Sequence, residues 1–153
     1  QTYCLRAGTY GPTGGDGYLF APVKGSARKI VTAVLQNSVD RPEIAQRDIQ
    51  VLLWAIVARS KFEDLNTRLK LVAAQLLTER ELLSMNRNAI DILTSREVTQ
   101  AVGGMPAPLA RIARAEADMR RMMSTGSSYS DLEAVAVLVL DGISVFYHNV
   151  SVR

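Results

Sequence analysis

One decapeptide constrains the fold of this chain more than any other feature. Residues 49–58 read IQVLLWAIVA, and Gln50 is their single polar side chain. A helix that is apolar around its whole circumference is buried in a protein core. The segment therefore predicts a central helix over residues 48–60, with the other elements packed around it. It is far shorter than the roughly 20 apolar residues of a bilayer span, so we expect no membrane span.

The length of the chain limits the number of domains. Its 153 residues, 48% of them hydrophobic, can bury one core but are too few for two independent domains. We expect one mainly helical domain over residues 1–153, with a small sheet formed by the N- and C-terminal strands. The C-terminal strand pattern runs directly into Arg153, which leaves open that the chain is a fragment of a longer one.

Apolar residues at spacings of three and four predict the remaining helices. The expected ranges are 26–37, 62–76, 79–85, 89–93, 96–102 and 108–123, with a last helix from residue 130 through the AVAVLVL run. The valines of that run also leave a strand open as its structure. In the 108–123 helix, we expect four side chains to face the core: Leu109, Ile112, Met119 and Met123.

Local signals mark where these helices begin. Ser26 and Ser95 are expected to cap the helices that follow them. Thr78 with Glu81, and Ser130 with Glu133, have the spacing of a capping box. The residues between Asp40 and Glu43, which include a proline, are typical of a helix start that leads into the central helix.

Three short segments are typical of strands, namely residues 3–5, 18–21 and 143–152. The first two flank a loop, RAGTYGPTGGDG, that holds five glycines. Its glycines lack the following Lys-Ser/Thr of a phosphate-binding loop, and Asp16 adds a negative charge, so we interpret it as a surface loop. Such loops carry recognition, which makes its residues, with Tyr18 beside them, candidates for binding: Thr9, Tyr10, Asp16 and Tyr18.

Charge and histidine content argue against two classes of function. Eighteen Lys and Arg against fifteen Asp and Glu give a net charge of +3, and the two signs are interleaved along the chain. A nucleic-acid binder more often shows a basic stripe with aromatic residues between the charges, so we expect no nucleic-acid partner. The single histidine, His148, rules out a zinc-binding histidine cluster. No motif indicates a metal or another cofactor.

The chain holds one cysteine, Cys4. It begins at Gln1 without an initiator methionine, which favours a processed N-terminus and therefore an exported protein, secreted, on the cell surface or periplasmic. In an exported protein, an unpaired cysteine indicates an intermolecular bond, a free thiol or special chemistry. Cys4 with His148 as its base would make a hydrolase or transferase. The neighbours of Gln50 indicate that its amide is partly buried and needs partners, such as a carbonyl of the N-terminal strand.

Two short motifs resemble those of a known family. Residues 3–5, YCL, and residues 49–54, IQVLLW, resemble the paired motifs of the thioester domains of bacterial surface adhesins. The resemblance covers residues 3–58 at most. It implies an internal thioester between the sulfur of Cys4 and the side-chain carbonyl of Gln50, with Tyr3 and Trp54 as supporting residues.

The resemblance favours a function without turnover. We expect an exported bacterial binding or structural module that attaches covalently to a protein or surface ligand through this thioester. The alternative is the Cys-dependent enzyme that uses Cys4 and His148. The sequence leaves the ligand and the oligomeric state open.

Overall fold

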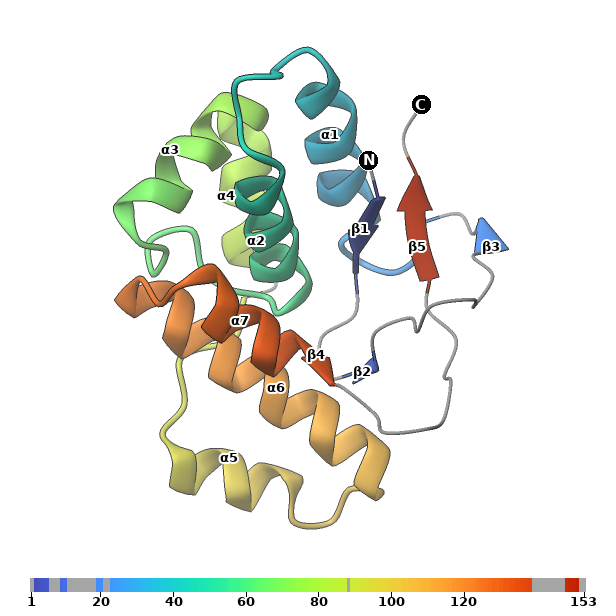
Figure 1. The fold of residues 1–153 in the computed structure, drawn as a ribbon. Helices are drawn as coiled ribbons and strands as arrows, with labels where there is room; N and C mark the ends of the chain where they lie inside the picture. Colours follow the sequence, from blue (N-terminus) through green and yellow to red (C-terminus); the bar gives the residue numbers. More distant parts are fainter. Residues whose placement is uncertain are drawn as a thin grey trace.

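The computed structural model describes residues 2–5, 9–10, 19–20, 23–87, 89–138 and 148–151. Most of them belong to seven helices: α1 (Arg28–Val39), α2 (Gln46–Val57), α3 (Thr67–Leu76), α4 (Glu79–Arg87), α5 (Ser95–Val102), α6 (Ala107–Thr125) and α7 (Tyr129–Ala136). Helices α1 to α4 form one group, α6 and α7 pack side by side against it, and α5 lies along α6 (Figure 1). Within the described residues, no helix combines the length and the apolar character that a bilayer crossing requires.

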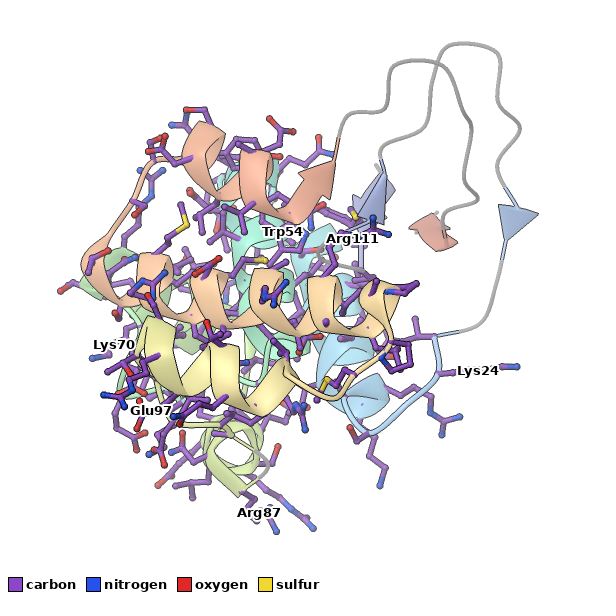
Figure 2. The ribbon with its side chains drawn as sticks, turned by 90° about the horizontal axis from the view of Figure 1, so that it is seen from below. Lys24, Trp54, Lys70, Arg87, Glu97 and Arg111 are labelled. Carbon is purple, nitrogen blue, oxygen red and sulfur yellow. The ribbon has the colours of Figure 1, made fainter. Side chains whose placement is uncertain are left out.

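Helix α2 is the centre of the core, as its composition predicts. The eight consecutive residues 49–56 are all buried, and the helix contacts α1, α3, α6, α7 and strand β1. Trp54 is only 1% exposed. In Figure 2 it lies inside the bundle, whereas Lys24 and Arg87 project from the outside. A helix with apolar side chains on every face is stable only when neighbours cover every face, and here they do.

Short strands lie beside the helices and confirm the mainly helical class with a small sheet. They are β1 (Thr2–Cys4), β2 (Thr9–Tyr10), β3 (Leu19–Phe20), β4 (Val137–Leu138) and β5 (His148–Ser151). Strand β5 lies between β1, to which it is antiparallel, and β3, to which it is parallel. Strands β2 and β4 form a separate parallel pair. The N- and C-terminal strands therefore meet, side by side in Figure 1.

Two helices do not begin at their predicted start signals. Residues 41–44 form a turn, closed by the Ile44 N–H donating to Arg41 at 3.1 Å, and α2 starts only at Gln46. Helix α3 starts at Thr67 and not at residue 62, because the Asn66 side chain caps it by accepting the Leu69 N–H. Apolar spacing continues through residues 62–66, so it could not locate the start of α3.

The end of α2 is a sharp reversal at Arg59. This residue has a φ of 57°, in the left-handed region that non-glycine residues seldom adopt. The helix ends at Val57, and the Ser60 N–H reaches back to the Ala55 carbonyl at 2.9 Å. The prediction of a helix to residue 60 was therefore too long.

Of the four predicted caps, one is present, two are shifted, and Ser26 is wrong, because Ala27 precedes α1 and no side chain caps it. The Thr78–Glu81 box is present, with the Thr78 N–H donating to Glu81 at 2.8 Å. At α5 the cap is Thr94, which forms a capping box with Glu97, and not Ser95. At α7 the Ser128 hydroxyl accepts the Asp131 N–H at 3.2 Å, so the predicted Ser130–Glu133 box is wrong. After α7, the valine run becomes strand β4.

Two other predictions were wrong. Residues 89–93 are not helical, because tertiary contacts hold them without regular secondary structure: the Ile90 N–H donates to the Arg59 carbonyl at 2.9 Å, and Asp91 pairs with Lys61. Leu109 was expected to face the core but is 56% exposed. It lies in the first turn of α6, the end away from α3 and α4 (Figure 1). Met119 and Met123, further along α6, are fully buried as predicted.

Candidate functional site

Strand β1 contacts α2, and the side chains of Tyr3 and of Leu5, just after the strand, pack on the core. Tyr3 is buried against the core, and a hydrogen bond joins its hydroxyl to Ser38 of α1. Burial raises the pKa of Tyr3, and the bond with Ser38 opposes that shift only in part. Leu5 packs on the same core. These contacts fix the position of Cys4, which lies between Tyr3 and Leu5 and is partly exposed.

The side chain of Gln50 bonds the backbone of Cys4 in both directions. The Cys4 N–H donates to Gln50 Oε1 at 2.8 Å, and Gln50 Nε2 donates to the Cys4 carbonyl at 2.7 Å. Both polar groups of one strand residue point to the same edge of the strand, so Gln50 covers the edge of β1 that faces away from β5. The predicted burial of Gln50 and its carbonyl partner in the N-terminal strand are thereby confirmed.

This pairing fixes the carboxamide of Gln50 beside Cys4. The amide is 46 residues away in sequence, yet both of its polar atoms bond a single residue. Its oxygen already accepts a backbone N–H, the type of donor that stabilises negative charge on a carbonyl oxygen during nucleophilic attack. The arrangement can therefore activate the carboxamide carbon toward a nucleophile placed next to it.

Trp54 lies one helical turn after Gln50 on α2, and α7 packs against it through Tyr129. The Tyr129 ring stacks on the Trp54 ring with centroids 5.8 Å apart and an interplanar angle of 22°. The Trp54 indole N–H is buried and has no hydrogen-bond partner among the described residues. A buried donor without a partner costs about 1–3 kcal/mol.

Tyr129 also links this aromatic pair to charged neighbours. Its hydroxyl donates to Glu133, one turn further along α7, at 3.4 Å. Burial is the main cause that raises the pKa of Tyr129, and the negative charges of Glu133 and of an ionised Cys4 raise it further. The hydroxyl is therefore protonated at neutral pH.

A groove of about 520 Å³ lies on the other side of Tyr129. It runs between the first turns of α2, α3 and α7, and its lining includes both hydroxyl and charged side chains. Asp48 and Arg68 in its lining form an ion pair at 2.8 Å. Arg47 also lines the groove, which therefore has one more positive than negative side chain.

A second group of charged side chains lies at the end of α2 and supports the fold. The Arg120 guanidinium is buried and donates to the Ala58 carbonyl, while its Nε has no partner among the described residues. Burial raises the pKa of Glu116, and the positive charges of Arg59 and Arg120 oppose that shift. Arg120 bonds a carbonyl at the C-terminal end of α2, so we interpret this group of side chains as stabilising the end of that helix.

The structure brings together four of the residues predicted for the thioester site, Tyr3, Cys4, Gln50 and Trp54. Of the predicted binding loop, Thr9 and Tyr10 are described only as the backbone of β2. Asp16 and Tyr18 lie outside the described residues. The backbone of His148 belongs to β5, where the next residue, Asn149, is opposite Cys4, but its side chain is outside the description.

Sequence reasoning missed Tyr129 and Glu133. Tyr129 lies in a serine-rich segment that predicts only a loop, and Glu133 was expected only as the partner of Ser130 in a capping box. Their spacing of four is a weak signal, since it places two side chains on one helix face without naming the partner of that face. Within the described part of the chain, no three His, Cys, Asp or Glu residues form a group that could hold a metal ion.

Comparisons with protein-family models, with curated proteins and with solved structures give no match for this chain.

Proposed function

We propose that this chain is an exported bacterial binding module, without turnover, that carries an internal thioester between Cys4 and Gln50 and uses it to attach covalently to a protein or surface ligand. The observation that supports the proposal is the double hydrogen bond of the Gln50 amide to the Cys4 backbone. The resemblance of the YCL and IQVLLW segments to adhesin thioester domains supports the same pair.

The bond-forming step needs only these two side chains. The Cys4 sulfur attacks Cδ of Gln50, a carbon–sulfur bond forms, and the carbon–nitrogen bond breaks. Ammonia leaves with the proton of the thiol. The Cys4 N–H stabilises the charge that develops on Oε1 in this step, and the burial of Gln50 limits hydrolysis of the product by water.

The attachment step consumes the thioester. An amine or hydroxyl of the ligand attacks the same carbon, a bond to nitrogen or oxygen forms, and the carbon–sulfur bond breaks. The proton of the nucleophile ends on the Cys4 sulfur. Because thiolates are good leaving groups, the acyl carbon is activated without a cofactor. Each molecule acts once and remains tethered to its ligand.

The mass of the intact protein tests the proposal. The wild-type protein should be lighter than its sequence mass by one ammonia and should resist iodoacetamide. Methylamine should restore mass by one methylamine and release an alkylatable thiol. Cys4→Ser and Gln50→Glu, the matched controls, should each have full sequence mass. A wild-type protein with full mass and an immediately alkylatable thiol would exclude the thioester and leave a cysteine beside a hydrogen-bonded glutamine.

The strand register supports the alternative function, a Cys-dependent hydrolase or transferase that uses Cys4 and His148. Because Asn149 is opposite Cys4, the backbone of His148 is one residue from that position. Turnover of a thioester or peptide substrate that is lost in both Cys4→Ala and His148→Ala would favour this enzyme over the covalent module.

A further inference from the structure

The segment that leads into α1 gathers positive charge, and we call its residues 24–29 the basic turn. A hollow of about 380 Å³ lies on it, and within the described residues its lining holds three basic side chains and no acidic one: Lys24, Gly25, Ser26, Arg28 and Lys29. None of these three basic side chains forms an ion pair in the described part of the chain. In Figure 2, Lys24 extends outward from this turn. The basic turn therefore presents three uncompensated positive charges around one hollow.

The start of α1 adds to this positive potential. No side chain caps the helix, and no acidic residue lies in its first turn. The first N–H groups of a helix have no partner within the helix, and the helix dipole places partial positive charge at that end. Gly25 has a φ of 94°, in the left-handed region that favours glycine, and its carbonyl accepts the Arg28 N–H at 3.2 Å. The helix start and the basic side chains together favour an anion here.

A smaller cavity adjoins the hollow and shares Ser26 with it. Its volume of about 30 Å³ is room for about two water-sized groups. The rest of its lining comes from the first turn of α1, from the reversal at the end of α2 and from α4: Ala27, Ile30, Ile56, Arg59, Ser60, Ser84 and Met85. A ligand whose charged group occupies the hollow can therefore extend a small second group into this cavity.

Ser60 is the buried polar residue of this cavity. It is only 4% exposed, and its hydroxyl has no hydrogen-bond partner among the described residues. The Ser84 hydroxyl, in contrast, donates to the Glu81 carbonyl at 2.8 Å. Arg59, directly before Ser60, has the left-handed φ of 57°. Buried polar groups without partners and strained backbone are features of ligand sites, so both observations indicate that a polar atom of a ligand completes this cavity.

We propose that this end of α1 binds a small phosphorylated polyol, with its phosphate on the basic turn and one of its hydroxyl groups in the cavity at Ser60. A phosphate ester carries nearly two negative charges at neutral pH, which matches three cations better than a carboxylate does. It accepts hydrogen bonds from Arg28, from the two lysines and from the first N–H groups of α1. Arg59 is not assigned to the phosphate, because its charge also acts on Glu116. The site is independent of the proposed thioester.

Calorimetric titration with sn-glycerol 3-phosphate, inorganic phosphate and glycerol tests the proposal. We expect glycerol phosphate to bind, and inorganic phosphate to bind about tenfold more weakly because it leaves the Ser60 hydroxyl unpaired. Glycerol, which lacks the charge, should give no detectable binding. Failure of both phosphate compounds to bind overturns the proposal. Equal affinity of the two overturns the part of the proposal that concerns the cavity.

Arg28→Gln tests the basic turn. It should weaken glycerol phosphate binding about tenfold, the loss of one hydrogen bond between charged groups. Arg96→Gln removes an exposed arginine from α5, which lies at the opposite end of the helices from α1 in Figure 1, and should leave the affinity unchanged. Equal weakening by the two variants would show attraction to the net charge of the protein and would contradict a site at α1.

Ser60→Ala separates a ligand contact from a role in the fold. The variant should bind glycerol phosphate only as tightly as inorganic phosphate, whose own affinity should not change. Its stability without ligand should not fall, because the deleted hydroxyl has no partner among the described residues. A variant that keeps the wild-type preference for glycerol phosphate contradicts the role of Ser60. If Ser60→Ala does not fold, the preference of the wild-type protein for glycerol phosphate over inorganic phosphate still decides the role of the cavity.

Discussion

The carboxamide of Gln50 takes the place of a neighbouring strand at Cys4. Its nitrogen lies 2.7 Å from the Cys4 carbonyl oxygen, and its oxygen lies 2.8 Å from the Cys4 backbone nitrogen. The Gln50 side chain thus satisfies both backbone polar groups of Cys4 at the edge of β1 and joins this strand to the central helix. These two hydrogen bonds join β1 to α2 and so contribute to the stability of the fold.

Replacing Gln50 by alanine should destabilise the protein. The change leaves the Cys4 N–H and carbonyl without their partner, and each buried polar group left unpaired costs about 1–3 kcal/mol. Chemical denaturation should show this loss. Gln75→Ala, which removes an exposed glutamine from α3, is the matched control and should change stability by less than about 0.5 kcal/mol. Equal stabilities of the two variants would show that water replaces the Gln50 amide.

The protein should be more stable with glycine at position 59 than with alanine there. Arg59 has a φ of 57°, a conformation that costs a residue with a Cβ about 1–2 kcal/mol and glycine almost nothing. Arg59→Gly and Arg59→Ala lose the same guanidinium, so their difference in unfolding free energy isolates the backbone term. We expect Arg59→Gly to be the more stable by about 1 kcal/mol. If Arg59→Ala is equally stable, the left-handed conformation is not kept in solution.

The charge on Glu116 should make the folded protein less stable as pH rises. Burial raises the pKa of Glu116 above that of the unfolded chain, despite the opposing charges of Arg59 and Arg120. Between the two pKa values the folded state binds more protons than the unfolded state, so its stability falls with increasing pH in that window. This contribution is favourable below the ordinary glutamate pKa and is lost as pH rises through the raised one.

Glu116→Gln should therefore gain stability relative to wild type as pH increases across that window. Denaturant melts at a series of pH values provide the measurement. Glu79→Gln removes one exposed negative charge at the start of α4 and serves as the control. If Glu116→Gln and wild type show the same pH dependence, the carboxyl is hydrated or fully compensated by the two arginines.

The sequence by itself determined the features that depend on short-range chemistry. An apolar decapeptide can only be buried, and residues 49–56 of α2 are. Thr78 and Glu81, three residues apart, form a capping box wherever a helix follows them, and they do so here. The buried amide of Gln50 required partners, and the apolar residues around Cys4 required cover. These demands predicted that strand and helix meet.

Only the tertiary structure decided the features that depend on distant partners. Residues 89–93 have a helical pattern, but the Ile90 N–H donates to the distant Arg59 carbonyl, and the segment is not helical. Leu109 has helical spacing toward the core, but its turn lies where no neighbour covers it. Tyr129 meets Trp54 because α7 folds back across α2, a contact between residues 75 positions apart. Periodicity and capping describe interactions between residues a few positions apart. The positions of residues 89–93, Leu109 and Tyr129 depend instead on which apolar surfaces and polar groups of distant elements need a partner in the folded core.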